Sequence, residues 1–206
     1  SFDEVEEKLC KMGFPKNDIC VKPFVSHGSR GTRIITDDIS KFGYSIEKRP
    51  FNIFIGFNDF IKSLNNSFPS VFLSEYLPGE EWGIDIFVDP HNKKNIIATR
   101  NNGDVQSSAV AHGQLRRNDA LIEIAKKITN QIKFCYIINI DIKYSTAGLP
   151  KLIEINPRVP AAVNLVSNSG NNFPLIAVKR ALNEEVDYKN IQYGKEALFY
   201  KRSIVI

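Results

Sequence analysis

The sequence predicts an α+β protein, and three segments carry this prediction. Residues 2–12 place apolar side chains at helical spacing and end at Gly13, and residues 118–132 form a second apolar helical face behind the N-cap candidate Asn118. Residues 138–156 instead alternate with period two on both sides of a turn that contains glycine, as a β-hairpin does. With 206 residues and 43% hydrophobic residues, the chain can bury the core of one large domain or of two small ones.

The other elements alternate between helices and strands along the chain. We expect a small first lobe, residues 1–73, and a larger second lobe, residues 74–206. The expected strands are 19–22, 32–35, 71–73, 82–89 and 96–99. We expect one further helix that begins at Asn58 or Asp59, and another that runs from about Pro174 to Leu182.

Composition and charge narrow the setting of the protein. No apolar stretch approaches the roughly 18 residues that a membrane-spanning helix needs, and the acidic start is unlike a signal peptide. The net charge of +4 is small and dispersed, so we expect neither nucleic acid nor a membrane as a partner. The three cysteines have no CxxC spacing, which indicates a reducing, cytoplasmic location and no zinc site.

The hairpin in residues 138–156 predicts a metal site. A turn centred on Ala147-Gly148 pairs apolar residues on one face and polar residues on the other. Carboxylates that face each other across two strands repel unless a cation lies between them, and oxygen ligands favour Mg²⁺ or Mn²⁺. The alternatives are a solvated polar face or a register shifted by one residue. The expected pairs are Ile140 with Ile155 and Ile142 with Ile153 on the apolar face, and Asp141 with Glu154 and Asn139 with Asn156 on the polar face.

Two further segments are candidates for nucleotide binding. Lys22 precedes the small-residue loop that contains Gly28, Ser29 and Gly31, where backbone N–H groups could approach phosphate oxygens; the alternative is a flexible hairpin tip. Residues 74–82 carry three carboxylates between the two expected lobes. These are either surface charge or acceptors for an adenine amine and ribose hydroxyls.

Taken together, these segments resemble the ATP-grasp superfamily, in the branch of carbamoyl-phosphate synthase and the carboxylate–amine ligases. The resemblance covers nearly the whole chain, and four motifs occur in the family's order. Leu9 to Pro15 is similar to LxxxGFP, and Val21-Lys22-Pro23 with Gly28 to Gly31 is similar to VKPxxGxGSxG. Glu75 to Trp82 is similar to EEYxxGxEY, and Asp141 with Leu152 to Arg158 is similar to DxxxxxxGxPyLiEiNPR.

The resemblance implies an ATP-grasp fold of two α+β lobes with ATP between them, and a role for each matching residue. Asp141, Glu154 and Asn156 would hold Mg²⁺ (or Mn²⁺) on the phosphates. Arg158, and with less support Arg100, would stabilise the transferring phosphoryl group. The nucleotide itself would be bound by Lys22, Gly28, Ser29, Gly31, Glu75, the backbone at Leu77, and Glu81.

The activity implied by the resemblance is that of a ligase. It would transfer the γ-phosphoryl group of ATP to a carboxylate, and an amine or similar nucleophile would then attack the acyl phosphate. The alternative is a non-catalytic nucleotide-binding domain. The expected partners are a small carboxylate, an amine acceptor and the preceding α/β domain that the family carries, with a second copy of the chain as a further candidate. Since the sequence begins with Ser1 and lacks that domain, we expect a truncated piece without activity of its own.

Overall fold

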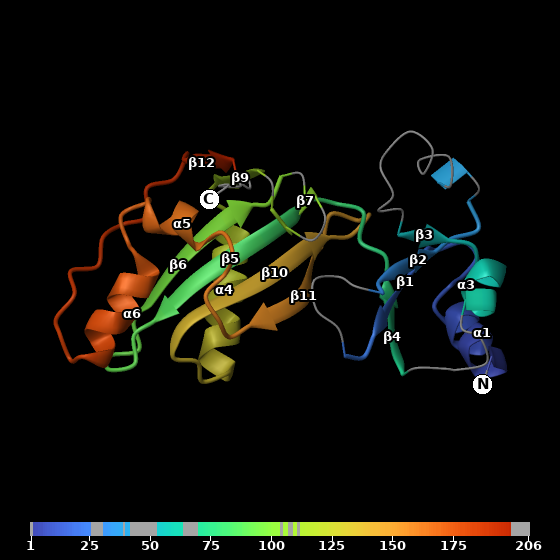
Figure 1. Ribbon diagram of the computed structural model, residues 1–206, viewed down its shortest axis with the longest axis horizontal. Coiled ribbons are helices and arrows are strands. Elements are labelled where there is room, and N and C mark those ends of the chain that lie inside the picture. The colour runs from blue at the N-terminus through green and yellow to red at the C-terminus, as the bar shows by residue number, and fades with distance from the viewer. Residues whose placement is uncertain are drawn as a thin grey trace, which may run out of the picture. The chain divides into compact units, whose positions relative to one another are not determined.

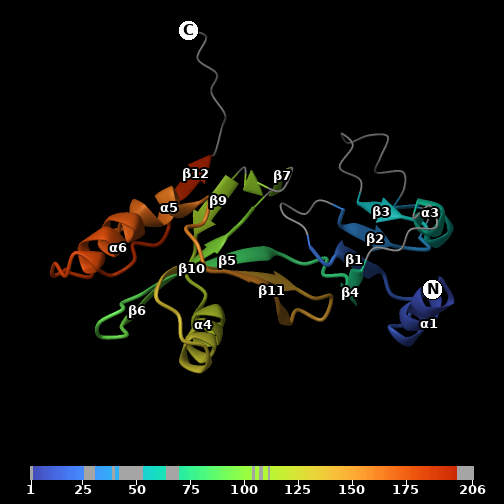
Figure 2. The same ribbon diagram turned by 60° about the horizontal axis from the view of Figure 1, so that its bottom comes forward.

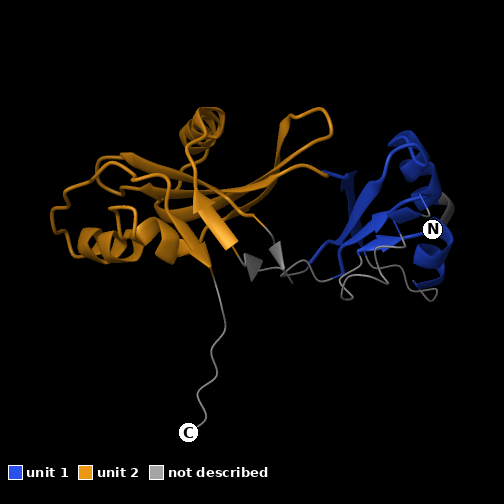
Figure 3. Ribbon diagram, turned by 90° about the horizontal axis from the view of Figure 1, so that it is seen from above, with its two compact units in different colours: residues 1–77 blue, residues 78–206 orange. Residues whose placement is uncertain are grey.

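The computed structural model describes residues 2–25, 31–38, 40–41, 53–63, 70–103, 105–106, 109–110 and 112–198. The chain forms two units, Ser1–Leu77 and Pro78–Ile206 (Figure 3). The boundary that we expected after residue 73 lies inside a strand of the first unit, because that strand pairs with another strand of the same unit.

The first unit packs helices against a four-stranded sheet. The sheet has the order β3-β2-β1-β4, with β1 antiparallel to both β2 and β4 (Figure 1). The hairpin expected around the small-residue loop is therefore present as β1 and β2. The elements are α1 (Phe2–Lys11), β1 (Ile19–Pro23), β2 (Arg33–Ile35), β3 (Phe54–Ile55), α3 (Phe57–Ser63) and β4 (Val71–Glu75).

Helix α1 has the position and the end that the sequence predicts. Val5 and Leu9 are buried on one face, while Glu4–Lys8 and Glu7–Lys11 ion pairs lie on the exposed faces. Gly13 follows the helix with φ +93°, a left-handed conformation that glycine adopts without strain. These helical side chains join Ile19, Val21, Ile35 and Phe60 in the core of the first unit.

The second unit is built on a six-stranded sheet in the order β11-β10-β5-β6-β9-β12, and each neighbouring pair is antiparallel (Figure 1). Its strands are β5 (Glu81–Val88), β6 (Asn95–Asn101), β9 (His112–Leu115), β10 (Tyr136–Tyr144), β11 (Pro150–Asn156) and β12 (Glu196–Leu198). A separate two-stranded ribbon is formed by β7 (Val105–Gln106) and β8 (Ala109–Val110).

Helix α4 (Asp119–Gln131) covers one face of this sheet, and α5 (Val163–Ser167) and α6 (Phe173–Ala181) cover the other (Figures 2 and 3). Asn118 accepts a hydrogen bond from the Leu121 amide, which confirms the predicted N-cap of α4. The α4 face buries the even-numbered residues of β5 and β10, whereas Phe87 and Ile137 pack on the α5–α6 side. The odd-numbered residues of β5 and β10 therefore share one face of the sheet.

The β10–β11 hairpin confirms most of the predicted register. Asn139 lies opposite Asn156, Ile140 opposite Ile155, and Asp141 opposite Glu154. The prediction that Ile142 lies opposite Ile153 is wrong, because Ile142 pairs with Leu152. The connection is longer than a two-residue turn, since the Ser145 amide donates to the carbonyl oxygen of Leu149, and a β-bulge in β11 absorbs the resulting shift of one residue.

None of the helices in the described residues combines the length and the apolar composition that a membrane-spanning segment requires.

Candidate functional site

The candidate site is a group of polar side chains on the odd-numbered face of the second unit's sheet. Strand pairing places them in two rows that cross β6, β5, β10 and β11. Neighbouring side chains within a row are about 4.5–5.5 Å apart at their Cβ atoms. The first row is Arg100, Gly83, Asp141 and Glu154, and the second is Ala98, Asp85, Asn139 and Asn156.

Asp85 is the buried centre of this group. Its side chain is 0% exposed and accepts from Arg100 Nε at 2.9 Å on one oxygen and from Asn139 Nδ2 at 3.1 Å on the other. Arg100 also donates to the side-chain oxygen of Asn102, and is itself only 4% exposed. A buried ion pair of this kind costs desolvation energy, so it is more informative about geometry than about stability.

Gly83 makes room for the Arg100 side chain. A Cβ atom on Gly83 would lie 2.3 Å from Cζ and 2.4 Å from a terminal nitrogen of Arg100, distances that real Cβ contacts do not reach. The guanidinium of Arg100 thus crosses β5 at the one position in the row that lacks a side chain. This brings its charge toward Asp141, which is the next residue in the row.

Three oxygen atoms converge on Asn156. Its Nδ2 donates to Glu154 Oε1 at 2.8 Å, to Asp141 Oδ2 at 3.3 Å and to Asn139 Oδ1 at 3.4 Å. An amide nitrogen has two hydrogens, so three acceptors exceed what it can satisfy. Among the described residues no group of three His, Cys, Asp or Glu side chains could hold a metal ion, and the hairpin offers two carboxylates with amide oxygens instead.

The electrostatics of the group centre on Asp141. Burial raises the pKa of Asp141 to about 6, the Arg100 charge opposes that rise, and the carboxylates of Glu154, Glu81 and Asp85 add to it. Lys143 lies 3.7 Å from Glu81 and partly balances that carboxylate. The site therefore concentrates negative charge that a bound cation would relieve.

The second unit thus brings together five of the residues that the sequence singled out: Glu81, Arg100, Asp141, Glu154 and Asn156. Arg158 follows β11 by two residues, is exposed, and donates to the carbonyl oxygen of Val159 at 3.3 Å. In the described part of the chain no ion pair joins Arg158 to the carboxylates of the hairpin.

The first unit holds the other predicted residues. Lys22 is half-buried on β1 opposite Phe72, and Glu75 ends β4 opposite Ile19. The two therefore lie three residues apart along the strands, or about 10 Å. Gly31 has φ +75° just before β2, Leu77 is half-buried at the end of the unit, and Gly28 and Ser29 lie outside the described residues.

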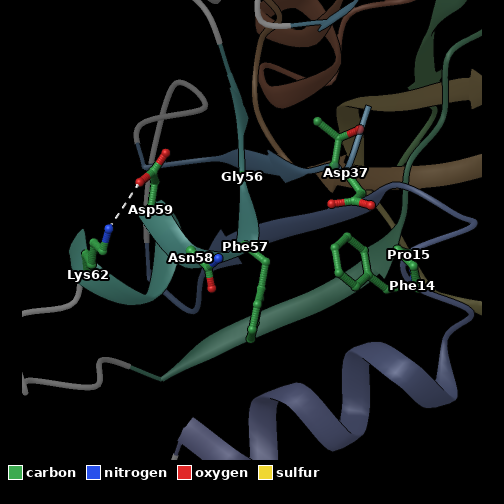
Figure 4. Close-up of a pocket in the computed structure, with 9 residues that line it drawn as sticks. Phe14, Pro15, Asp37, Gly56, Phe57, Asn58, Asp59 and Lys62 are labelled. Atoms are coloured by element: carbon green, nitrogen blue, oxygen red, sulfur yellow. Dashed lines mark ion pairs between the residues drawn. The ribbon is translucent and has the colours of Figure 1, made fainter. Parts of the chain in front are cut away.

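A pocket of about 500 Å³ opens on the first unit beside α3 (Figure 4). Phe14 and Phe57 form part of its wall, with ring centroids 6.0 Å apart, and an Asp59–Lys62 ion pair of 4.0 Å lies at its rim. None of the predicted site residues lines it. Its charged lining residues, Asp37, Asp59 and Lys62, are all exposed, so it lacks the buried charged groups that converge in the hairpin site.

Sequence reasoning missed two residues that shape the hairpin site, Gly83 and Asp85. Both signals were present in residues 81–88, where apolar even-numbered positions alternate with Glu81, Gly83 and Asp85. A glycine inside a strand marks a close approach of another group, and an aspartate inside a buried strand needs a partner. The sequence did not reveal which strands would supply these partners.

Several solved structures are similar to this chain in fold. N5-carboxyaminoimidazole synthetase from Staphylococcus aureus, complexed with ADP, aligns with a TM-score of 0.63 at 13% identity, over 95% of this chain and 48% of that one. The biotin carboxylase domain of Hydrogenobacter thermophilus 2-oxoglutarate carboxylase, solved with MgADP, ADP and bicarbonate, aligns with a TM-score of 0.66 at 13% identity, covering 95% and 43%. Campylobacter jejuni biotin carboxylase, in a β,γ-ATP complex, gives 0.66 at 12% identity, covering 94% and 43%.

The fold and the family match define an ATP-grasp protein, as the motifs predicted. Residues 67–198 match the family described as ATP-grasp in the biosynthetic pathway with Ter operon, and the chain belongs to that family. The chain spans less than half the length of each solved structure named above. A comparison with curated protein sequences gives no match.

Proposed function

We propose that this chain is the nucleotide- and metal-binding core of an ATP-dependent ligase that activates a carboxylate. The observation that carries the proposal is the convergence of oxygens from Asn139, Asp141 and Glu154 on the amide of Asn156. The similar structures hold ADP, MgADP or β,γ-ATP, which agrees with this assignment.

The hairpin residues fit a hard divalent cation. Mg²⁺ and Mn²⁺ take carboxylate and amide oxygens, and a rotation of the Asn156 amide would exchange its nitrogen for its oxygen. Asp141, Glu154 and Asn156 would then hold the cation, which supplies charge neutralisation at the phosphate oxygens. Burial is the main cause of the raised pKa of Asp141, and the charge of the cation would offset the repulsion from neighbouring carboxylates that adds to it.

The predicted nucleotide residues have matching roles in this proposal. Lys22 offers a point charge for a phosphate, and Gly31, with Gly28 and Ser29, a backbone that can approach phosphate oxygens. Glu75, the backbone at Leu77, and Glu81 would accept hydrogen bonds from the adenosine. Arg158 is exposed, so its side chain is available to an acyl phosphate. Arg100 is buried, and its positive charge acts on the site through the neighbouring carboxylates.

The proposed reaction has two steps. A carboxylate oxygen of the substrate attacks the γ-phosphorus of ATP, and the bond to the bridging oxygen breaks, so that ADP leaves and an acyl phosphate forms. The amine nitrogen then attacks the acyl carbon and forms the C–N bond. The C–O bond to phosphate breaks, phosphate leaves with its electron pair, and the nitrogen loses a proton. The cationic groups Lys22, Arg100 and Arg158 would stabilise the charge that develops on the transferring oxygens.

The proposed substrates are a small carboxylate and an amine or similar nucleophile. Cys10 and Cys135 are exposed thiols outside any disulfide, and with the need for ATP this supports a cytoplasmic setting. The complete enzyme would carry a further α/β domain, and a second copy of the chain is a further candidate partner. The second candidate function is an ATP-grasp domain that binds nucleotide without turnover, which the exposed position of Arg158 leaves open.

Calorimetric titration with ADP and Mg²⁺ tests the proposal. We expect binding to the 206-residue chain, and a loss of at least about 10-fold in affinity in Glu154→Gln, because that change removes a charged metal ligand. Glu123→Gln is the matched control, since Glu123 is exposed on α4 and pairs with Lys126. Equal affinity of the parent chain and Glu154→Gln would contradict the metal assignment.

Release of ADP in the presence of a panel of carboxylates and amines separates the two candidate functions. A ligase releases ADP only with its cognate carboxylate, and trapping with hydroxylamine converts the acyl phosphate to a hydroxamate. Binding of nucleotide without either product across the panel would favour the non-catalytic domain.

A further inference from the structure

We propose that Asp85 is a positioning residue that directs the side-chain oxygen of Asn139 toward the hairpin, so that Asn139 supplies an additional oxygen to the bound divalent cation. This inference rests on the proposed function, because it concerns the same metal site. It adds two residues that the motifs leave without a role.

The hydrogen bonds around Asn139 permit one orientation of its amide. The nitrogen and oxygen of an amide are similar in shape, so the neighbours decide which way it faces. Asp85 is fully buried, is ion-paired with Arg100, and as a carboxylate can only accept. Asn139 must therefore turn its Nδ2 to Asp85, at 3.1 Å, and its Oδ1 toward Asn156.

The opposite orientation fails at both ends. A flipped Asn139 would direct its carbonyl oxygen at the Asp85 carboxylate, two acceptors with no proton between them. In the metal-free arrangement it would also direct its Nδ2 at the Nδ2 of Asn156, two donors with no acceptor, and with the cation bound it would offer that cation an amide nitrogen in place of an oxygen ligand. Since Asn139 is only 3% exposed, water cannot readily compensate for these losses.

Arg100 holds the Asp85 carboxylate in the position that this orientation of Asn139 requires. The Arg100 Nε hydrogen bond of 2.9 Å and the space over Gly83 fix a positive charge against the carboxylate. The same arrangement occupies the second Asp85 oxygen, so that the first is left for Asn139 alone. The result is a relay from Arg100 through Asp85 and Asn139 to the oxygens around Asn156.

Binding of Mn²⁺ in the presence of ADP, followed by the electron paramagnetic resonance signal of the free ion, tests the relay without turnover. We expect about 10-fold weaker Mn²⁺ binding in Asp85→Asn, because the new amide can donate to Asn139 and so permits the opposite orientation of the Asn139 amide. We expect a similar loss in Asn139→Leu. Because Asp85 acts through Asn139, the double variant should bind as Asn139→Leu alone does.

Asp89→Asn is the matched control. Asp89 is also 0% exposed and follows β5 directly. It is paired at 3.2 Å with Arg180, whose side chain is 14% exposed. Asp89→Asn should lose thermal stability and keep the Mn²⁺ affinity of the parent chain within twofold. If Asp85 had a purely structural role, Asp85→Asn would likewise lose stability and keep its Mn²⁺ affinity. Asn139→Leu preserves the Asp85–Arg100 ion pair and decides the question alone if Asp85→Asn does not fold.

Two results would overturn the inference. One is unchanged Mn²⁺ affinity in Asn139→Leu, and the other is a double variant whose losses multiply. Glu154→Gln in the same assay reports on the proposed function separately. If Glu154→Gln abolishes binding and Asn139→Leu does not weaken it, the metal site stands and the relay is wrong, whereas unchanged binding in Glu154→Gln refutes the site itself.

Discussion

Two buried aspartates on one face of the second unit show how differently similar ion pairs can be used. Asp85, in β5, and Asp89, directly after it, are both 0% exposed and each binds an arginine, Arg100 or Arg180. The network around Asp89 is closed. Besides Arg180, Asp89 accepts hydrogen bonds from the Tyr188 hydroxyl and from the backbone N–H groups of His91 and Asn92.

The network around Asp85 is open. It continues through Asn139 to Asn156, whose two amide hydrogens face oxygens of Asn139, Asp141 and Glu154. The acceptor oxygens there outnumber the donor hydrogens. The pKa values differ accordingly. Burial would raise the pKa of Asp89, but the hydrogen bonds from Tyr188 and the backbone outweigh it and lower that pKa, whereas burial raises the pKa of Asp141 to about 6. A buried ion pair therefore indicates a site only where its hydrogen bonds end in uncompensated charge.

Replacing each arginine by methionine should give the largest difference between the two networks. Arg100→Met leaves four neighbouring carboxylates without their buried cation and should cost about 3–5 kcal/mol of unfolding free energy, of which added Mg²⁺ restores a part. Arg180→Met leaves Asp89 its other donors and should cost about 2 kcal/mol, with no effect of Mg²⁺. Urea unfolding with and without Mg²⁺ measures both, and equal responses to Mg²⁺ would erase the distinction.

Asp141→Asn should stabilise the metal-free protein. An unfolded aspartate has a pKa of about 3.9, and that of Asp141 is about 6, so the folded protein holds a proton that the unfolded chain has lost. The unfolding free energy should therefore fall as the pH rises from about 4 to about 6, by up to about 3 kcal/mol, and Asp141→Asn should remove that fall.

Asp89 should contribute a pH dependence of the unfolding free energy with the opposite sign. Because its pKa is lowered, its contribution is present at neutral pH and is lost as the pH falls below about 4. Asp89→Asn should therefore alter the pH dependence of the unfolding free energy only below about pH 4. Asp141→Asn should alter it, with the opposite sign, in urea unfolding between pH 4 and pH 7.5. A pH dependence that Asp141→Asn leaves unaltered would show that another group titrates in this range.

The comparison also shows how far the sequence could predict the site. Period-two alternation and the glycine in the turn were enough to place Asp141 opposite Glu154 and Asn139 opposite Asn156. The register nearer the turn was wrong because the Ser145 hydroxyl accepts from the Leu149 amide and helps to stabilise a longer connection, which alternation does not encode. That error shifted Ile142 but left the polar pairs unaffected.

The part of the site that could not be predicted depends on long-range strand order. Gly83 and Asp85 acquire their roles because β5 lies between β6 and β10, so that Arg100 reaches over one and Asn139 pairs with the other. Asp85 and Asn139 are 54 residues apart in the sequence, and a local pattern does not specify which strands become neighbours. The boundary between the two units was likewise set by the pairing of β4 with β1.

Gly83→Ala should cost about 1–3 kcal/mol, because the new Cβ would lie 2.3 Å from Cζ of a guanidinium that Asp85 and Asn102 hold in place. Gly148→Ala is the control, since no atom lies within 4 Å of its Cβ position and only its φ of +70° opposes the change, at about 1 kcal/mol. In an Arg100→Ala background the cost of Gly83→Ala should nearly vanish. A cost that persists there would mean that the backbone of β5, and not the arginine, requires the glycine.

Tyr188→Phe should have the smallest effect, a loss of about 1 kcal/mol, because it removes one neutral donor from a carboxylate that keeps Arg180 and two backbone N–H groups. The ring itself packs against Phe87, with centroids 6.1 Å apart, and phenylalanine preserves that contact. Since the Asp89 network is closed, the loss should be the same with and without Mg²⁺ and ADP. A Tyr188→Phe variant whose Mn²⁺ affinity also falls would show that the two networks on this face are coupled, and the contrast between Asp85 and Asp89 would then be one of degree.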